Sequence, residues 1–157
     1  MNHSPMEFAH RTMQIYERQC APVRKEFGLT QTAFDILLFL ANNPEHRTAR
    51  DIVEVRRLKA NLVSVNVDRL ANEGYLIREK MPEDRRKIKL TLTEKANPVI
   101  RKGREFQKKF SRALSEGLSE ADLEKLSQIT QQIEKNLDAL SDRPDSSDHA
   151  NAQEKKS

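Results

Sequence analysis

"YLIREKMPEDRRKIKLTLT", residues 75–93, decides the fold. Apolar and polar residues alternate in its second half (87–93), which is typical of a half-buried strand. The first half (75–81) is a second strand candidate. Between the two, Pro82 and Asp84 are residues that favour turns. The stretch therefore predicts a β-hairpin whose tip carries two adjacent arginines.

Three short helical segments precede this hairpin. Thr30 can cap a helix whose apolar residues recur at i, i+3, i+4 and i+7. "TARD" (48–51) has the pattern of a capping box and opens a second helix. A third runs from about Lys59 to Asn72 and ends before Gly74, because glycine readily adopts a positive φ. Three compact helices and a hairpin predict a winged helix-turn-helix lobe over about residues 30–95.

Longer helical segments flank this lobe at residues 6–26 and 97–140. In the second segment, one helix begins at Thr93 or at Asn97 and continues to about Leu114, and a last helix is capped by Ser119, with Asp122 three residues on. Both carry apolar stripes that would lack a partner in a monomer. The pattern as a whole predicts a homodimer, although helical spacing alone would also fit an intramolecular bundle. Residues 141–157 have almost nothing to bury and are predicted to be a disordered tail.

Composition agrees with one mainly α-helical domain over residues 1–140, with a small β-hairpin wing. The 157 residues are 33% charged and only 5% aromatic, which is typical of a helix-rich globular protein. The longest apolar run, 36–41, is much shorter than the ~20 residues of a membrane span. The N-terminus lacks the apolar core of a signal peptide, so we expect a cytoplasmic protein without a membrane partner.

Positive charge is concentrated in the middle of the chain. Residues 56–89 contain ten lysines and arginines against five acidic residues, a net charge of +5, whereas the whole chain has +4. This distribution favours a polyanionic partner. The alternative is that these charges only solvate helix faces, which is the commoner role of charge runs.

Three segments together resemble the MarR family of transcriptional regulators: "LTQTAFDILLFLANNP" (29–44), "SVNVDRLANEGYLIREKMPEDRRKIKLTLTEKA" (64–96) and "LSEADLEKLSQITQQIEKNL" (118–137). The resemblance extends over residues 6–140. It implies a homodimer that binds pseudo-palindromic double-stranded DNA, often as a repressor, and is often released by a small-molecule effector or by oxidation. The helices at 6–26 and 97–140 would be its dimerisation helices.

The resemblance assigns roles to the hairpin tip. The family's D-x-R pattern falls on Asp84 and Arg86, with Arg86 entering the narrow, electronegative minor groove of A·T-rich DNA. Asp84 would hold an arginine in position by a charge-assisted hydrogen bond. Lys80, Arg85 and Lys87 are predicted phosphate contacts. The alternative is an ordinary solvated turn.

Angular sorting at 100° per residue divides the third lobe helix. Val63, Val67 and Leu70 fall on the core side. The predicted DNA-binding residues of this recognition helix are Lys59, Asn61, Leu62, Ser64, Val65 and Arg69.

This helix departs from the family at one base-reading position. The family's common Ser-Arg pair is here Ser64-Val65, and a valine can pack against a thymine methyl but cannot hydrogen-bond guanine. We therefore expect an A·T-leaning operator, with Asn61 reading adenine. The alternative is that Val65 only covers neighbouring side chains.

Two further departures lie at the ends of the lobe's elements. Arg56 and Arg57 stand where the family often has Leu-Gly; they would change the turn before the recognition helix and add phosphate contacts. Ala96 replaces a glycine usual after "LTEK", which affects the local backbone path. Cys20, the single cysteine, is either a redox-active thiol or a buried, inert one, and the second is favoured because no other cysteine can resolve it.

Other function classes find less support in the sequence. We find no nucleophile–base pair, glycine-rich phosphate loop or metal-ligand cluster, so the chain is predicted not to be an enzyme and to need neither cofactor nor metal. A winged helix that contacts only proteins would not need Arg86. A non-specific architectural DNA binder would bind DNA in a salt-dependent manner with little sequence preference.

Overall fold

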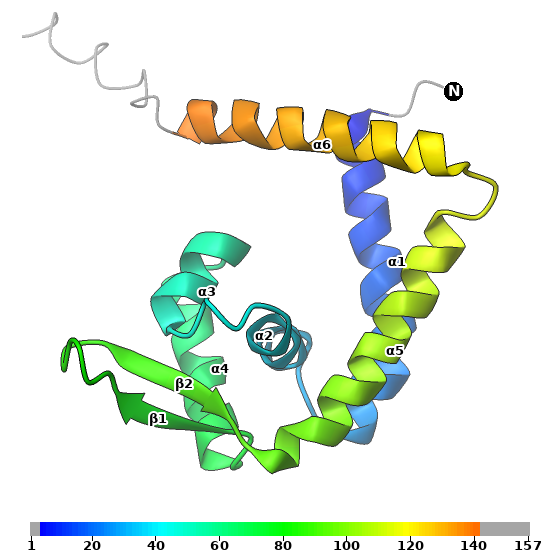
Figure 1. The fold of residues 1–157 in the computed structure, drawn as a ribbon. Coiled ribbons are helices and arrows are strands. Elements are labelled where there is room, and N and C mark those ends of the chain that lie inside the picture. The colour runs from blue at the N-terminus through cyan, green and yellow to red at the C-terminus, as the bar shows by residue number, and fades with distance from the viewer. Residues whose placement is uncertain (1–3, 142–157) are drawn as a thin grey trace, which may run out of the picture. The chain divides into compact units, whose positions relative to one another are not determined.

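The computed structural model describes residues 4–141 and is mainly helical with one hairpin (Figure 1). The elements are α1 (Pro5–Glu26), α2 (Gln31–Asn42), α3 (Ala49–Arg56), α4 (Ala60–Asn72), β1 (Leu76–Lys80), β2 (Ile88–Leu92), the 3₁₀ turn η1 (Glu94–Ala96), α5 (Asn97–Leu114) and α6 (Glu120–Ser141). Two compact units divide the chain, the first ending at Arg112 and the second beginning at Ala113. The winged-helix order predicted from the sequence is confirmed.

Helix α2 is the centre of the first unit. Figure 1 shows it end-on, with α3 and α4 on one side and α1 and α5 on the other. Its hydrophobic residues are almost all buried, including Phe34 and Leu37 at 0% exposure. The helix begins where the sequence predicted, because the Thr30 hydroxyl accepts a hydrogen bond from the Ala33 N–H at 3.1 Å.

The hairpin packs on this core through one face. β1 and β2 pair antiparallel, with Leu76 opposite Leu92 and Lys80 opposite Ile88. Leu76 and Leu90 are buried, and the Leu90 N–H also donates to the Arg47 carbonyl at 2.7 Å, which ties the hairpin to the segment before α3. Of the alternating apolar residues of β2, Leu90 is buried and Leu92 is half-buried, but Ile88 is 39% exposed, so burial follows the predicted alternation only in part.

The sequence allowed the helix after β2 to begin at Thr93 or at Asn97, and the structure has a helical element beginning near each of them. Thr93 is the N-cap of the 3₁₀ turn η1, and α5 begins at Asn97, which has helical backbone angles and is also the C-cap of η1. Ala96, where the family has glycine, is fully buried in this turn.

Helix α6 lies in the second unit, which begins at Ala113. Its capping box is present as predicted: the Ser119 N–H donates to the Asp122 carboxylate at 3.0 Å, and the Asp122 N–H donates to the Ser119 hydroxyl at 3.2 Å. No residue of α6 is buried. Of the predicted tail, only Ser141 is described, as the last residue of α6; residues 142–157 lie outside the described residues. Within 4–141, no helix is both long and apolar enough to cross a membrane.

Candidate nucleic-acid interface

Helix α3 and the turn after it form the first half of the helix-turn-helix. The predicted capping box opens α3: the Asp51 N–H donates to the Thr48 hydroxyl at 3.1 Å, and the Thr48 N–H donates to the Asp51 carboxylate at 2.8 Å. Burial acts to raise the pKa of Asp51, but hydrogen bonds from Thr48 and the Arg47 N–H lower it overall. This local network fixes the direction in which α3 leaves the loop.

The turn between α3 and α4 is strained at Arg57. This residue has φ = 53°, and among residues 4–141 it is the one non-glycine residue with positive φ. The left-handed region costs a non-glycine residue roughly 1–2 kcal/mol. The departure from the family's Leu-Gly therefore places an arginine at a backbone position that suits glycine.

Arg56 is exposed at the end of α3. It lines a pocket of about 280 Å³ together with Tyr16, Asp35 and Gln107. Its charge also acts to lower the pKa values of Tyr16 and Asp35, although burial, the largest effect on each, raises both. Its predicted contact with phosphate stays a prediction.

Helix α4 presents the predicted recognition face. Val63, Val67 and Leu70 are buried, as the angular sorting predicted. Val65 is 66% exposed and Leu62 is 41% exposed, so neither side chain is buried in the core. Asn61, Ser64 and the N-cap residue Lys59 are exposed as well.

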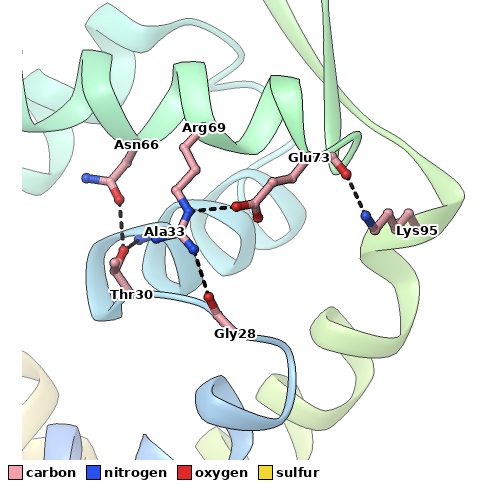
Figure 2. Close-up of polar contacts among 7 residues, drawn as sticks. All are labelled: Gly28, Thr30, Ala33, Asn66, Arg69, Glu73 and Lys95. Atoms are coloured by element: carbon pink, nitrogen blue, oxygen red, sulfur yellow. Dashed lines mark hydrogen bonds and ion pairs between the residues drawn. The ribbon is translucent and has the colours of Figure 1, made fainter.

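Arg69 departs from the predicted orientation. Its guanidinium donates from Nε to the Glu73 carboxylate at 2.7 Å and from a terminal nitrogen to the Gly28 carbonyl at 2.9 Å (Figure 2). Angular sorting placed it beside Leu62, but it lies about two turns further along, where the chain between α1 and α2 passes. At least two of its donors are therefore directed at the protein, and its predicted contact with DNA stays a prediction.

A buried polar residue on α4 escaped the sequence reasoning. Asn66 is only 7% exposed. Its side-chain oxygen accepts from the Thr30 hydroxyl at 2.8 Å, and its amide donates to the Leu62 carbonyl at 2.9 Å. The residue borders the core side at 100° per residue, but its partner lies 36 residues away, which no local pattern reveals.

The hairpin tip is a tight turn organised by Asp84. The Lys87 N–H donates to the Asp84 carbonyl at 2.9 Å, and the Arg86 N–H donates to the Asp84 carboxylate at 3.0 Å. The predicted link between Asp84 and an arginine therefore exists, but it holds the main chain of Arg86 and not its guanidinium. This Asx turn fixes the backbone while Arg85, Arg86 and Lys87 remain exposed. Lys80, at the end of β1, is exposed too.

The remaining candidate groups do not form a reactive site. Cys20 is fully buried, and its thiol donates to the Gln31 side-chain oxygen at 3.0 Å. Burial raises the pKa of this thiol, so the structure favours the inert alternative. Across 4–141, no three His, Cys, Asp or Glu side chains come together in a way that could hold a metal ion.

Comparisons with known proteins agree with this geometry. A model of the MarR family matches residues 27–87. An uncharacterised HTH-type transcriptional regulator of Bacillus subtilis, YdcH, is 28% identical over 96 residues, which are 59% of this chain and 65% of that protein. The chain thus spans slightly less than two thirds of that relative's length.

Solved structures share the fold. A MarR family transcriptional regulator of Listeria monocytogenes, complexed with 26mer DNA, superposes with a TM-score of 0.78 at 15% identity and covers 86% of this chain and 89% of that one. BpsR of Bordetella bronchiseptica, whose DNA binding is regulated by 6-hydroxynicotinic acid, superposes with a TM-score of 0.66 at 18% identity and covers 85% and 95%. The MarR family model thus matches the winged-helix lobe of this chain, and the solved structures share its fold.

Proposed function

We propose that this protein is a MarR family transcriptional regulator that binds DNA sequence-specifically, acts in the cytoplasm as a homodimer and represses transcription from a pseudo-palindromic operator. The observation that carries the proposal is the hairpin tip. Its backbone is fixed by Asp84, yet the side chains of Arg85, Arg86 and Lys87 remain exposed. A fixed turn that carries exposed cations suits a narrow, electronegative groove.

The two DNA-facing elements would divide the reading between two grooves. Helix α4 would enter the major groove with Leu62 and Val65, whose exposed methyl groups can pack against thymine methyls. The hairpin would place Arg86 in the adjoining minor groove, where A·T pairs favour an inserted arginine. Both contacts favour A·T pairs, so we expect an A·T-leaning operator.

Homodimerisation would supply the second half-site. Helices α1 and α6 expose large apolar side chains, among them Met6 at 79% and Phe8 at 67%. Along α6 the exposed apolar residues are Leu123, Leu126, Ile129, Ile133, Leu137 and Leu140. Burying such stripes against a second copy would stabilise a dimer by the hydrophobic effect. A two-fold dimer would read half-sites one helical turn apart, about 34–36 Å.

A small-molecule effector would have a place to bind. The pocket of about 280 Å³ beside Arg56 joins polar groups of Tyr16, Asp35 and Gln107 with apolar neighbours. It lies among α1, α2, α5 and the end of α3, so a ligand there could change the position of the winged-helix lobe relative to α1. The BpsR structure supports such regulation in a protein of this fold.

The test is fluorescence anisotropy with DNA from upstream of the regulator's own gene and a scrambled duplex of equal composition. We expect selective binding whose logarithmic affinity falls linearly with the logarithm of salt concentration. Equal binding to both duplexes at several lengths of upstream DNA would favour an architectural DNA binder. Absence of binding at low salt to any duplex would refute the proposal and favour a protein-contact module.

A further inference from the structure

Arg69 and Asn66 tie α4 to the short corner that joins α1 to α2, residues 28–30. Figure 2 shows both side chains reaching from α4 to this corner, where Arg69 meets the Gly28 carbonyl and Asn66 meets the Thr30 hydroxyl. These contacts join residues 41 and 36 positions apart. Arg69 and Asn66 lie on the same face of α4, and their partners Gly28 and Thr30 lie within three consecutive residues. The two contacts therefore act together to hold α4 on the corner, and we call this pair of contacts the seat of α4.

The corner is itself held at both ends. Gly28 has φ = 66° and closes α1, because its N–H donates to the Lys25 carbonyl at 3.0 Å, and the next N–H, of Leu29, donates to the Arg24 carbonyl at 3.0 Å. Thr30 caps α2 through the Ala33 N–H. The Gly28 carbonyl, which accepts from Arg69, and the Thr30 hydroxyl, which donates to Asn66, are therefore both held in place by contacts of the corner itself.

The hydrogen bonds of Arg69 suggest that it holds α4 in place, because its guanidinium binds acceptors within the protein. Its guanidinium forks between Glu73 on its own helix and the Gly28 carbonyl across the corner. The Gly28 carbonyl lies at the C-terminal end of α1, where the helix dipole favours a cation. Arginine's planar fork can satisfy both acceptors at once, whereas a lysine ammonium is a single point charge.

The C-terminal end of α4 has a third support. The Lys95 ammonium donates to the Glu73 carbonyl at 2.5 Å and lies 4.6 Å from the centre of the Tyr75 ring. The C-terminal half of α4 is thus tied by polar contacts on two sides, while the side chains proposed to read bases lie about 10 Å away, near its N-terminus. A small rotation at the seat would move those side chains.

We propose that Arg69 is a positioning residue for DNA binding: it seats α4 on the 28–30 corner and so holds the exposed face with Leu62 and Val65 in the orientation that fits the major groove. This inference rests on the proposed function. Without the seat, only a fraction of molecules would hold α4 in the competent orientation, and the apparent Kd would rise by the inverse of that fraction. The number of phosphate contacts in the bound complex would not change.

The experiment compares operator affinity and its salt dependence for the full chain, wild type, Arg69→Met and Arg69→Lys. We expect both variants to bind about tenfold more weakly, which corresponds to about 1.4 kcal/mol, with an unchanged slope of log affinity against log salt. Arg69→Lys should not restore wild-type affinity, because a lysine ammonium cannot bind the Glu73 carboxylate and the Gly28 carbonyl at once. A slope that falls by about 1 in Arg69→Met, with recovery in Arg69→Lys, would overturn the proposal, because it would identify a direct phosphate contact.

Arg104→Met is the matched control. Arg104 also donates to a backbone carbonyl, that of Ala41 at 2.6 Å, and to the Asn42 side chain at 2.9 Å, but it joins α5 to α2 and does not touch α4. We expect it to lower the melting temperature without weakening DNA binding. Equal loss of affinity in Arg69→Met and Arg104→Met would refute a specific seat.

A second pair of variants keeps the proposal testable if Arg69→Met does not fold. Thr30→Ala removes the corner's other contact with α4, whereas Thr30→Ser retains the hydroxyl that serves both as cap and as donor to Asn66. We expect weaker binding at an unchanged salt slope for alanine and wild-type binding for serine. Wild-type protein that binds no DNA selectively would contradict the proposed function, whereas selective wild-type binding with all seat variants unaffected would contradict this inference alone.

Discussion

Substitution of Gly103 by alanine tests how closely α5 approaches the core. A Cβ at this position would lie 2.5 Å from Cδ2 of Leu38 and 2.9 Å from its Cδ1. Leu38 is 2% exposed and lines the pocket beside Arg56, so the overlap can be relieved only if its side chain leaves its present rotamer. Overpacking of this kind costs typically 1–3 kcal/mol, and both methyl groups of Leu38 are affected, which favours the upper part of that range.

Helix propensity opposes this loss, because alanine is favoured over glycine in a helix interior by about 1 kcal/mol. We therefore expect Gly103→Ala to lower the free energy of unfolding by about 2 kcal/mol. This would be seen as a melting temperature about 6 °C lower in thermal unfolding at fixed protein concentration. A single glycine would then account for the close contact between α5 and α2.

The Leu38→Ala background provides the control. That substitution alone should cost about 2–5 kcal/mol through the cavity it leaves. Once the two methyl groups are gone, Gly103→Ala should stabilise the protein by about 1 kcal/mol. The opposite signs in the two backgrounds are the signature of steric overlap. Gly103→Ala that is neutral or stabilising in the wild-type background would refute the close packing described here.

Two further substitutions probe strain and buried charge. Arg57→Gly removes the strain of a left-handed arginine but increases the conformational freedom of the unfolded chain. We expect the free energy of unfolding, measured by chemical denaturation, to rise by about 0.5 kcal/mol in Arg57→Gly and not to rise in Arg57→Ala. Equal stability of the two variants would contradict this. Burial raises the pKa of Asp35, so the folded state binds that proton more tightly, and stability falls as pH rises from the unfolded value of about 3.9 through the raised one. Asp35→Asn should therefore stabilise the protein at pH 7 and lose this advantage at pH 3.5, whereas an equal effect at both pH values would refute the assignment.

The parts of the fold that local sequence determines were predicted well. The caps at Thr30, Thr48 and Ser119 each need only partners within three residues, so a short pattern contains the whole interaction. The hairpin follows from a period of two and a turn with Asp84. The core face of α4 follows from its helical period.

Most of the features that the sequence did not reveal are contacts between residues that are far apart in the chain. Arg69 has the angular position of an exposed residue, but the 28–30 corner passes next to it, and no periodicity in α4 contains that information. The same holds for Asn66 and its partner Thr30. The positive φ of Arg57 was not foreseen either, although the substitution of a glycine at that point was noticed. The DNA contacts themselves remain predictions.

The most direct test of the central claim concerns Arg86 and the minor groove. Once an operator has been mapped by footprinting, its A·T pairs at the hairpin site can be replaced by G·C or by inosine·C. Inosine lacks the guanine 2-amino group, so inosine·C keeps an A·T-like minor groove while changing the major groove. Arg101→Ala, on α5 and exposed, serves as the control for loss of one positive charge.

We expect wild type and Arg101→Ala to bind the A·T and inosine·C operators alike and the G·C operator about tenfold more weakly, a difference within the 1–3 kcal/mol typical of a mismatched base pair. Arg86→Ala should bind all three with the same reduced affinity. Discrimination that persists in Arg86→Ala, or wild-type protein that treats inosine·C as it treats G·C, would contradict the placement of Arg86 in the minor groove.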